Sequence, residues 1–493
     1  MNDTIVIAGG GPAGLMLAGE LGLAGVRAIV LERETAPAGE RPTPGTTLHA
    51  RAEDLLDRRG LMDEIRAAEP VVWPRIHFGN IWIDLMPFIE EEYSLIVQQE
   101  RTERVLEARA LELGADIRRG HSLTGLTQDD GGVTAQVTGP DGAYELRCRY
   151  LVGCDGADSA VRRLAGIEAP PTGTPWYGVL ADFEAGDEDW EWGSPTYPGG
   201  LFAVIPHPDG SGLLRLMTVE FGVEPPAGDR PPTAEELSGC IRRITGKDYA
   251  LIGEPHWIHR YGGSTRLAAQ YRQGNVFVAG DAAHFYYFGA GHGLNTALHD
   301  AANLGWKLAA AIRGTAPAGL LDSYHDERHP VGRRACVSTQ AQMVLLHPYE
   351  RVEPLREIFE QLMKFPNVER YLVGVLTDVT YQMPHTGEAH PLLGCPIPDA
   401  QLTTTDGTTS IAAALRSGRG VLFDFSGGQQ DVAGVAPWAD QVDVVAAEPT
   451  DAIKATAVLA RPDGFVAWAD TTGSDSEGLA AALGAWFGAP AIS

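Results

Sequence analysis

Positive charge is scarce in this sequence of 493 residues. The formal net charge is −27, and the lysines are limited to Lys247, Lys307, Lys364 and Lys454. Nucleic acids and anionic membranes are bound by clustered Lys and Arg, so this balance argues against both as partners. No stretch approaches the roughly 18 apolar residues that a membrane span needs, and the N-terminus lacks the basic segment of a signal peptide. We therefore expect a soluble, cytoplasmic protein.

Cysteine is also scarce and is not arranged in pairs. Five cysteines occur, and none stands in a CxxC or other metal-ligand spacing. An odd number without such spacing fits a reducing cytoplasm better than a disulfide framework, and it predicts no metal site. The composition is otherwise that of a globular protein, with 44% hydrophobic and 21% charged residues. The length predicts two or three domains.

The N-terminus carries a dinucleotide-binding fingerprint. An apolar run at 4–8 is followed by Gly9-Gly10-Gly11-Pro12-Ala13-Gly14, a helical pattern over 15–24 and a second apolar run that ends in Glu32. In a βαβ unit Gly9 makes the tight turn, Gly11 lets the backbone approach a pyrophosphate, and Gly14 lets helix and strand pack closely. Glu32 can accept a hydrogen bond from a ribose hydroxyl and disfavours a 2′-phosphate. The pattern predicts a site for FAD or NAD; a glycine-rich turn without a ligand is the alternative.

A second glycine-rich stretch lies between a predicted strand and a predicted helix. The strand covers 275–279, the chain turns at Gly280-Asp281, and Gly289, Gly291 and Gly293 precede a helix that is predicted to start near Leu294. Glycines let backbone N–H groups approach a ligand, and a helix N-terminus adds partial positive charge. The stretch therefore predicts a site for an anionic or electron-rich cofactor, although a tight connector has the same glycines.

The remaining segments predict the rest of the architecture. Strands are expected within 70–98 and 115–150, and a helix is expected from 98 to about 113. Between 170 and 262 short alternating strands carry many aromatic residues, which either pack a β layer or line an apolar cavity. Helices are expected at 295–313, 323–345 and 350–380, followed by a connector at 384–398. The C-terminal unit has strands near 421–425, 442–446 and 456–461 and a final helix from 476.

Three separated motifs together resemble the FAD-dependent aromatic hydroxylases, the class A flavoprotein monooxygenases. The motifs are Gly9–Gly14 with Glu32, Asp155-Gly156 after Cys154, and Gly280-Asp281 with Gly293-Leu294-Asn295. The nearest likeness is to the polyketide hydroxylases and the rifampicin monooxygenase type. The resemblance implies an α/β fold: a Rossmann-like FAD-binding domain of the p-hydroxybenzoate hydroxylase type (1–171 and 263–383, with substrate-facing strands at about 70–98), an inserted β-sheet substrate domain (172–262), and a linker with a thioredoxin-like C-terminal domain (384–493). Without a CxxC, thiol redox chemistry is not expected in that last domain.

The resemblance also implies which residues contact FAD. The pyrophosphate would lie at the first glycine motif, the adenosine ribose at Glu32, the ribityl chain or pyrophosphate at Asp281, and the pyrimidine edge of the flavin at the backbone N–H groups of Leu294 and Asn295. The Asp155 motif is associated with FAD and NAD(P)H handling. The full implied set is Gly9, Gly11, Pro12, Ala13, Gly14, Glu32, Arg33, Arg41, Gln99, Asp155, Gly280, Asp281, Gly291, Gly293, Leu294 and Asn295.

The implied chemistry is hydroxylation of an aromatic or polyketide-like molecule. NADPH or NADH would reduce FAD, and oxygen would be transferred from a flavin C4a-hydroperoxide to an electron-rich ring. A large apolar or aromatic small molecule is the expected substrate, and a homodimer is the expected assembly. The candidate substrate-facing or catalytic residues are Tyr286, Tyr287, Phe288 and His292, with His284 as a further candidate base.

The same loop departs from the family pattern. Phe288 stands where relatives have proline, Ala290 where they have glycine, and His292 where glutamine is usual. Either the loop is adapted to a large apolar substrate, or oxygen transfer has been abandoned. In the second interpretation the chain resembles the FAD-containing, decalin-forming [4+2] cyclases, in which FAD is structural and a shaped cavity folds a polyene into its reactive conformer.

Overall fold

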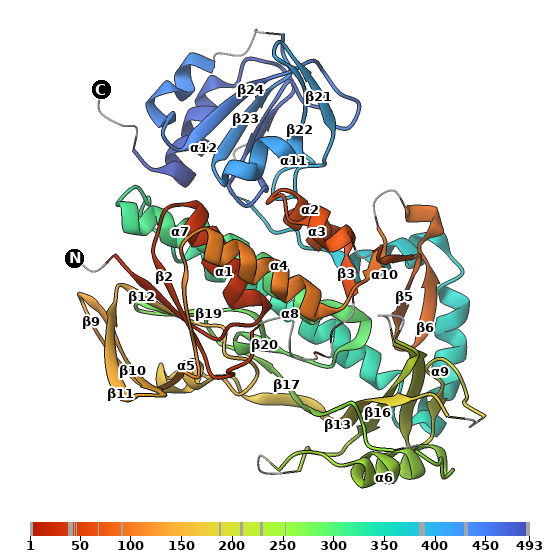
Figure 1. Ribbon diagram of the computed structural model, residues 1–493. Coiled ribbons are helices and arrows are strands. Elements are labelled where there is room, and N and C mark those ends of the chain that lie inside the picture. Colours follow the sequence, from red (N-terminus) through yellow and green to blue (C-terminus); the bar gives the residue numbers. More distant parts are fainter. Residues whose placement is uncertain are drawn as a thin grey trace.

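A computed structural model describes residues 3–489 except 38–42, 44, 46, 68, 90–91, 187–188, 208–210, 227–229, 252, 384–389 and 428–431. The described chain forms three units. A parallel sheet with its helices lies at the centre, an antiparallel sheet lies beside it, and a smaller C-terminal sheet lies across the central helices (Figure 1). This arrangement confirms the predicted α/β flavoprotein architecture.

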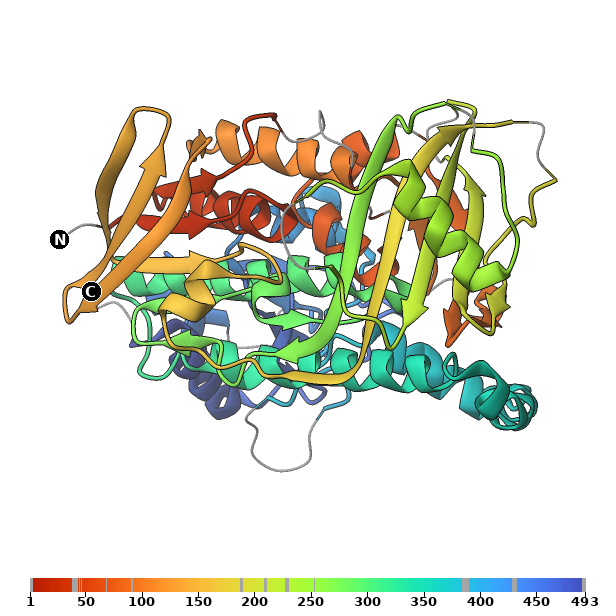
Figure 2. The same cartoon turned by 90° about the horizontal axis from the view of Figure 1, so that it is seen from below.

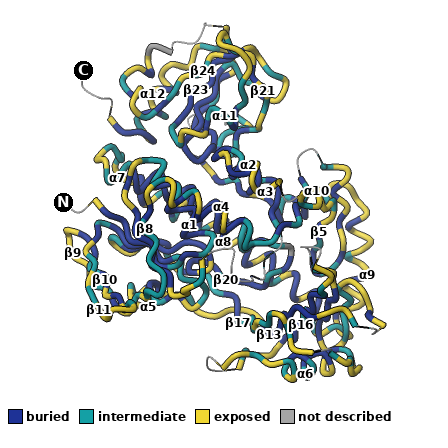
Figure 3. Tube along the Cα trace, in the orientation of Figure 1, coloured by how far each residue is buried: buried dark blue, intermediate teal, exposed yellow. Residues whose placement is uncertain are grey.

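The central sheet has the strand order β18-β19-β12-β1-β2-β8. Its strands are β1 (Ile5–Ala8), β2 (Ala28–Glu32), β8 (Asp116–Arg119), β12 (Tyr150–Gly153), β18 (Arg272–Gln273) and β19 (Val276–Val278), and all neighbours except β18 are parallel. β1, β2, β12 and β19 are buried along their full length (Figure 3). Continuous apolar runs form these strands because both faces of the sheet are covered.

Different elements cover the two faces of the central sheet. On one face lie α1 (Pro12–Leu23), α4 (Gln99–Glu112) and α7 (His292–Arg313), which share one core with Ile5, Ile7 and Val30. On the other lies the meander of β9 (Ser122–Asp129), β10 (Gly132–Gly139) and β11 (Gly142–Cys148), which packs its apolar side against Val6 and Ile29. The alternation of residues on opposite faces of each strand therefore separates two cores.

The antiparallel sheet has the order β14-β15-β16-β13-β17-β20. Its strands are β13 (Pro171–Glu184), β14 (Thr196–Tyr197), β15 (Gly200–Pro206), β16 (Leu213–Phe221), β17 (Trp257–Leu267) and β20 (His284–Phe285). Figure 2 shows β13 and β17 running side by side as long strands, where the sequence predicts only short ones. β20 pairs with β17, so the second glycine-rich stretch is itself part of this sheet.

A helix in this unit was not predicted. α6 (Ala234–Thr245) covers one face of the sheet with Leu237, Cys240, Ile241 and Ile244, which are all buried. The Thr233 side chain caps it by accepting a hydrogen bond from the Glu236 backbone N–H. The spacing of these apolar residues is helical, and it was hidden by the aromatic strands that surround it.

Two predicted helix boundaries were wrong. α7 begins at His292, not near Leu294, because Gly291 takes a φ of +72° and acts as the N-cap. The expected helix 350–380 is two helices, α9 (Tyr349–Leu362) and α10 (Pro366–Thr377), since Pro366 starts a new helix. α8 (Ser323–Val344) lies as predicted.

Smaller elements connect the units. Within 47–96, β3 (Thr47–His49), β7 (Ser94–Ile96) and β4 (Val71–Trp73) form one small sheet, and β5 (Arg75–Phe78) pairs with β6 (Ile81–Asp84). The short helices here and later are α2 (Ala50–Asp57), α3 (Met62–Arg66), α5 (Ala160–Leu164) and four-residue α11 (Ile411–Ala414), and β21 (Gln401–Thr404) pairs with β22 (Gly407–Ser410).

The C-terminal unit has a thioredoxin-like sheet. Its order is β24-β23-β25-β26, formed by β23 (Gly420–Asp424), β24 (Val442–Ala446), β25 (Ala457–Ala460) and β26 (Val466–Asp470), with α12 (Ser476–Phe487) packed on it. β23 and β24 are parallel, whereas β25 and β26 run antiparallel to their neighbours. All five cysteines of the chain are free.

A buried ionic cluster joins the C-terminal unit to the central helices. Arg461 donates to both carboxylate oxygens of Glu327 on α8, at 2.8 and 3.0 Å, and to Asp463 at 2.6 Å. Lys307 and Asn303 of α7 donate to the same Glu327 carboxylate, at 2.9 and 2.6 Å. Each of these charges is paired inside the junction, so removing one partner would leave an unpaired buried charge between the two units.

Candidate functional site

The first glycine motif forms a tight turn with one open position. A Cβ on Gly9 would lie 2.2 Å from the Cys154 carbonyl oxygen, and a Cβ on Gly14 would lie 2.0 Å from the Gly9 carbonyl oxygen. Gly9 also has a φ of +105°. Around Gly11, in contrast, no heavy atom lies within 4 Å of a built Cβ. Gly9 and Gly14 are therefore required by packing, whereas Gly11 faces space that a ligand can fill.

Glu32 stabilises the turn of the first glycine motif through hydrogen bonds. Its carboxylate accepts hydrogen bonds from the backbone N–H of Gly10, at 2.6 Å, and of Glu34, at 2.8 Å. The side chain is buried, so the carboxylate lies at the end of β2 beside the glycine turn. The neighbouring Arg33 is directed to solvent, where it lies 3.6 Å from Glu34.

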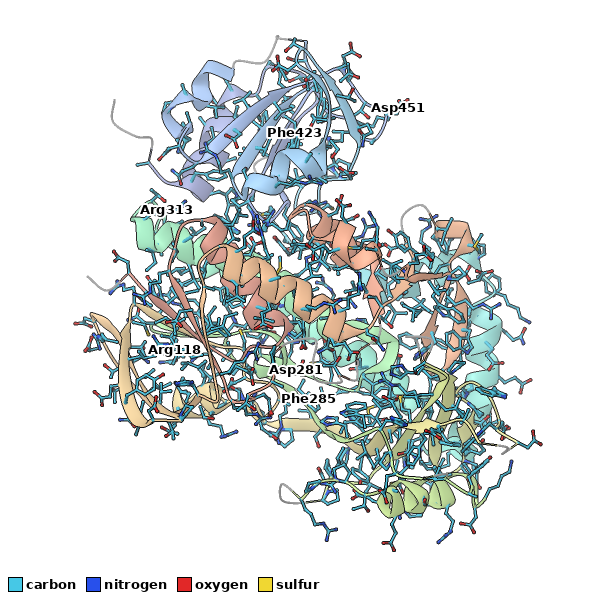
Figure 4. The ribbon with its side chains drawn as sticks, viewed as in Figure 1. Arg118, Asp281, Phe285, Arg313, Phe423 and Asp451 are labelled. Atoms are coloured by element: carbon cyan, nitrogen blue, oxygen red, sulfur yellow. The ribbon has the colours of Figure 1, made fainter. Side chains whose placement is uncertain are left out.

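The second glycine motif comes to lie against the first. A Cβ on Gly280, whose φ is +61°, would lie 3.2 Å from the Cβ atoms of both Ala13 on α1 and Ala297 on α7. Asp281 is exposed, and a Cβ on Gly293 would lie 3.9 Å from its Oδ1 atom. Protein atoms nevertheless surround the Asp281 carboxyl on most sides, and this burial raises its pKa. Figure 4 places Asp281 near the centre of the molecule.

Asp300 holds this second turn in place, although the sequence did not identify it. Its carboxylate accepts hydrogen bonds from the Gly280 backbone N–H at 3.0 Å and from Arg328 Nε at 2.8 Å, and it lies 2.6 Å from His284 Nε2. The side chains of Asp300, His284 and Arg328 are all fully buried. A charged residue on the buried face of α7 was the available signal, but its partners come from other segments.

Asp155 lies beside Gly9 but its carboxylate is engaged in a helix cap. One oxygen accepts a hydrogen bond from the Ser159 hydroxyl and the other from the Val161 backbone N–H, at the start of α5. The Asp155 backbone N atom would be 3.0 Å from a Cβ on Gly9. The motif therefore shapes the first turn through its backbone.

Two further predicted contacts are Arg41 and Gln99. Arg41 lies outside the described residues. Gln99, at the start of α4, donates from its backbone N–H to the Gly45 carbonyl at 2.9 Å and from its side chain to Glu103 at 2.7 Å. A Cβ on Gly45 would lie 2.3 Å from Gln99 Oε1, so a larger residue there would displace the end of that side chain.

The N-termini of α1 and α7 are both open to an anion. Neither helix has a side-chain cap or an acidic residue in its first turn. The Asn295 side chain instead clamps α7 to β3: its Oδ1 accepts from the His49 backbone N–H at 2.9 Å, and its Nδ2 donates to the Gly291 carbonyl at 2.7 Å. Leu294 is half-buried. Backbone N–H groups in the first turn of a helix have no partner within that helix, so these two helix starts suit a phosphate or another negative group.

The rings of Phe285, Tyr287 and Phe288, in the loop between the Gly280 turn and α7, pack into the antiparallel sheet. Trp176 of β13 is the hub, with ring centroids 5.5 Å from Tyr287, 5.6 Å from Phe288 and 6.2 Å from Phe285. Tyr286 points elsewhere: its ring stacks on His284, and its hydroxyl bonds to the Thr296 hydroxyl at 3.2 Å. Burial raises the pKa of Tyr286 and Tyr287 further above 10, so both phenols remain protonated at neutral pH.

His292 is a buried, neutral imidazole. It lies 6.4 Å from the His49 ring and 6.3 Å from the Tyr286 ring, and its Nε2 atom has no hydrogen-bond partner among the described residues. Burial, together with His49 and His77, lowers its pKa to about 3. An imidazole this acidic is a weak base. Among the described residues no group of three or more His, Cys, Asp or Glu is placed to hold a metal ion.

These features fit a dinucleotide. Gly11 has open space around it, α1 starts without a side-chain cap, and the buried Glu32 carboxylate lies at the end of β2, which is the arrangement that a dinucleotide fingerprint requires. The start of α7 lies on the other side of the Gly280 turn from α1. The structure thus brings the first and second motifs together.

Known families match almost the whole chain. Residues 2–339 match the family described as FAD binding domain, and residues 390–490 match the aromatic-ring hydroxylase C-terminal family. No helix in the described part of the chain is long and apolar enough to cross a membrane.

Individual relatives cover the chain from end to end. A 12-dehydrotetracycline 5-monooxygenase/anhydrotetracycline 6-monooxygenase from Streptomyces rimosus is 42% identical over 100% of both chains. A dialkyldecalin synthase from Streptomyces rugosporus is 41% identical over 99% of both chains. The solved structure of the anhydrotetracycline hydroxylase OxyS from Streptomyces rimosus superposes with a TM-score of 0.90, at 41% identity and 100% coverage of both chains. These matches confirm the resemblance inferred from the motifs, and the chain belongs to the FAD-dependent aromatic-ring hydroxylase family as an FAD-binding enzyme.

Proposed function

We propose that this enzyme is an NAD(P)H-dependent monooxygenase that uses FAD to hydroxylate a large aromatic, polyketide-like molecule. The observation that carries the proposal is the start of α7, which has neither a side-chain cap nor an acidic residue in its first turn. A positive helix end of this kind stabilises the negative charge of reduced flavin. Sequence identity does not make this choice, since a hydroxylase and a decalin synthase match almost equally, at 42% and 41%.

We place FAD along the two glycine motifs, which lie against each other at Gly280 and Ala13. Gly11, Pro12 and Ala13 receive the pyrophosphate at the start of α1, and the Glu32 carboxylate at the end of β2 accepts a ribose hydroxyl. Asp281, beside Gly293, faces the ribityl chain or pyrophosphate, and the N–H groups of Leu294 and Asn295 face the pyrimidine edge. Gly9, Gly14, Gly280, Gly291 and Gln99 shape the turns beside it.

The bound flavin supplies the redox chemistry, which is electron uptake from NAD(P)H and activation of O2. The chain positions the substrate and keeps water away from the reacting atoms. Tyr287 and Phe288 do so as part of the ring cluster around Trp176. Tyr286 and Tyr287 serve as protonated side chains, not as bases, because burial raises their pKa. His292 acts as a neutral imidazole because burial lowers its pKa to about 3.

The experiment is anaerobic reduction followed by product analysis. The purified yellow protein is mixed with NADPH and, separately, with NADH, with and without candidate aromatic polyketides, and is then exposed to oxygen. We expect bleaching of the flavin band, faster with substrate, and a product heavier by one oxygen atom. A flavin that neither nucleotide reduces, with the substrate isomerised at unchanged mass, would overturn the proposal.

That second outcome would identify the enzyme as a non-redox cyclase. The observation that favours this alternative is the aromatic loop, in which Phe288 takes the place of the usual proline and packs 5.6 Å from Trp176 and 5.5 Å from Tyr261. A cyclase needs only a shaped apolar wall that holds a polyene in a reactive conformer. The mass of the product separates the two functions in a single measurement.

We also propose that the enzyme is a cytoplasmic homodimer. Leu355, Ile358 and Leu362 are 48%, 60% and 45% exposed on one face of α9, and Phe365 follows at 60%. Such a row of exposed apolar side chains is typical of a surface that pairs with another protein. Free cysteines suit a reducing compartment. Sedimentation equilibrium of the wild type and of Ile358→Glu tests the assembly: the proposal expects a dimer that this substitution dissociates.

A further inference from the structure

The turn between β25 and β26 of the C-terminal unit is enclosed by the central helices. Its Arg461 and Asp463 side chains are 0% and 1% exposed. Its Pro462 carbonyl accepts a hydrogen bond from Arg59, which follows α2, at 2.7 Å. Arg59 in turn donates to both carboxylate oxygens of Glu20 on α1, at 2.5 and 2.9 Å. A turn of the C-terminal unit is therefore built into the unit that carries both glycine motifs.

Two consecutive residues of α8 connect this turn to the second glycine motif. Glu327 accepts two hydrogen bonds from Arg461, at 2.8 and 3.0 Å. The next residue, Arg328, donates to Asp300 at 2.8 Å, and Asp300 accepts from the Gly280 backbone N–H at 3.0 Å. All four side chains are buried. Close-packed interiors transmit strain, so a shift of Glu327 displaces the adjacent Arg328 and, through it, the Gly280 turn.

The same turn of the C-terminal unit also contacts α7. Asn303 donates to Glu327 at 2.6 Å and to Asp463 at 3.3 Å. Trp306 donates from its indole N–H to Asp463 at 3.3 Å. α7 is one continuous helix of 22 residues, and its first turn is the one that we place beside the flavin. The position of that first turn therefore depends on where the cluster holds the middle of the helix.

Arg461 carries the charge balance of this cluster. It donates to both Glu327 and Asp463, and Lys307 donates to Glu327 at 2.9 Å. Burial raises the pKa of the Glu327 carboxyl, but Arg461 and Lys307 more than offset this and hold it below its usual range. Without the Arg461 guanidinium, two buried carboxylates would share the Lys307 ammonium. Like charges this close repel, so the side chains would separate or take up a proton.

We propose that Arg461 is a positioning residue for the flavin: through Glu327 and Arg328 it holds the turn of the second glycine motif and the first turn of α7 where they bind FAD. The C-terminal unit thereby sets the affinity and reduction potential of a cofactor whose proposed contacts all lie in the central unit. Loss of Arg461 displaces the positive start of α7, so reduced, anionic flavin loses more stabilisation than oxidised flavin. The inference rests on the proposed position of FAD and not on the proposed reaction.

Two quantities of the full-length protein test this role. The dissociation constant of FAD is measured by fluorescence titration, and the midpoint potential of the bound flavin is measured with protein in excess, by reduction with xanthine and xanthine oxidase against a reference dye. Arg461→Gln should bind FAD at least tenfold more weakly. Its potential should fall by about 30 mV, which is a tenfold loss of reduced relative to oxidised flavin for a two-electron couple. A wild-type value of either quantity would overturn the proposal.

Val458→Ala is the matched control. Val458 is fully buried on β25 of the same unit, but it belongs to the core around Phe423 and not to the ionic cluster. This variant should lower the temperature of thermal unfolding while both flavin quantities keep their wild-type values. If Val458→Ala and Arg461→Gln changed the flavin quantities equally, Arg461 would act only on the stability of the fold, and its positioning role would be refuted.

A double variant tests the route to the second glycine motif. If Arg461 acts through Arg328 and Asp300, then Arg461→Gln combined with Asp300→Asn should weaken FAD binding by less than the product of the two separate effects. A combined effect equal to that product would refute the route.

Arg461→Lys keeps the inference testable if Arg461→Gln fails to fold. One ammonium group cannot replace a guanidinium that donates to Glu327 and Asp463 at once, so FAD should still bind more weakly than in the wild type and in Val458→Ala. Wild-type affinity and potential in Arg461→Lys would then overturn the proposal. Neither measurement uses NADPH, oxygen or a substrate, so a failure of the proposed reaction leaves this test intact.

Discussion

Asp300→Asn should loosen the turn that carries the proposed flavin contacts. Asp300 accepts from Arg328 and from the Gly280 backbone and lies 2.6 Å from His284, with its own side chain fully buried. Asparagine keeps one accepting oxygen but leaves the buried Arg328 without a charged partner. Removing one member of a buried ion pair is destabilising by about 3–5 kcal/mol. We expect a loss near the lower end of that range, together with weaker FAD binding because Gly280 loses its anchor.

The assay is urea unfolding at pH 7, followed by circular dichroism and by the rise of flavin fluorescence on release. Asp451→Asn is the matched control: Asp451 pairs only with the exposed Lys454 and lies at the periphery of the C-terminal unit (Figure 4), so this variant should unfold like the wild type. The reasoning fails if Asp300→Asn unfolds at the same urea concentration as Asp451→Asn and retains its flavin equally well.

The pH dependence of the same variant has a defined sign. Burial alone raises the pKa of Asp300, but His284 and Arg328 more than offset it and hold the pKa below 3.8. A carboxyl whose pKa is lowered by folding contributes stability above its unfolded pKa and loses that contribution as the pH falls through its folded pKa. Asp300→Asn should therefore show its full deficit at neutral pH and a shallower loss of stability below pH 4.

The other predictions concern packing, charge and chemistry. Gly14→Ala should lower the temperature of thermal unfolding, since its Cβ would be 2.0 Å from the Gly9 carbonyl oxygen. Gly11→Ala should fold normally but bind FAD more weakly in a flavin titration, and equal flavin affinity in Gly11→Ala and wild type would contradict the site. Burial lowers the pKa of Lys307 to about 8, so folding releases a proton between about pH 8 and 10.5. The free energy of unfolding of the wild type should therefore rise relative to that of Lys307→Met across this range, and parallel pH profiles of the two proteins would contradict this. Phe288→Pro should fold, because Phe288 already has a φ of −68°. If the mass of the product shows more oxygen transfer in this variant than in the wild type, the Phe288 ring restrains that chemistry.

Local patterns in the sequence were sufficient for the first turn but not for the residues that support it. The strand, glycine and helix order from residue 4 to Glu32 predicts its own geometry, because each element contacts its sequence neighbours. Asp300 acts through Arg328 and His284, and Glu327 acts through Arg461, which is 134 positions away. Such pairings depend on how whole units pack, and no periodicity within one segment encodes them.

Some features that the sequence analysis did not predict depend on local chemistry, and others depend on contacts between distant segments. The break before Pro366 and the helix with Leu237 and Ile241 were readable from local chemistry, but longer or more aromatic neighbours obscured them. The direction of the Tyr286 ring was not readable. It turns to His284 while the adjacent Tyr287 turns to Trp176, and this choice is made by β20 pairing with β17.

The pairing of β20 with β17 explains how this fold can support either oxygen transfer or cyclisation. Gly9, Gly14 and Gly280, which we propose lie beside FAD, stand where an added Cβ would be 2.0 to 3.2 Å from other atoms of the central unit. The loop rings instead contact the antiparallel sheet, through Trp176 and Tyr261. Substitutions at Phe288 or Trp176 can therefore change the shape beside the flavin without loosening the turns that hold it. The choice between oxygen transfer and cyclisation should therefore follow the sheet and its loop, and swapping the Phe288 and Trp176 rings should alter the product while flavin affinity stays constant.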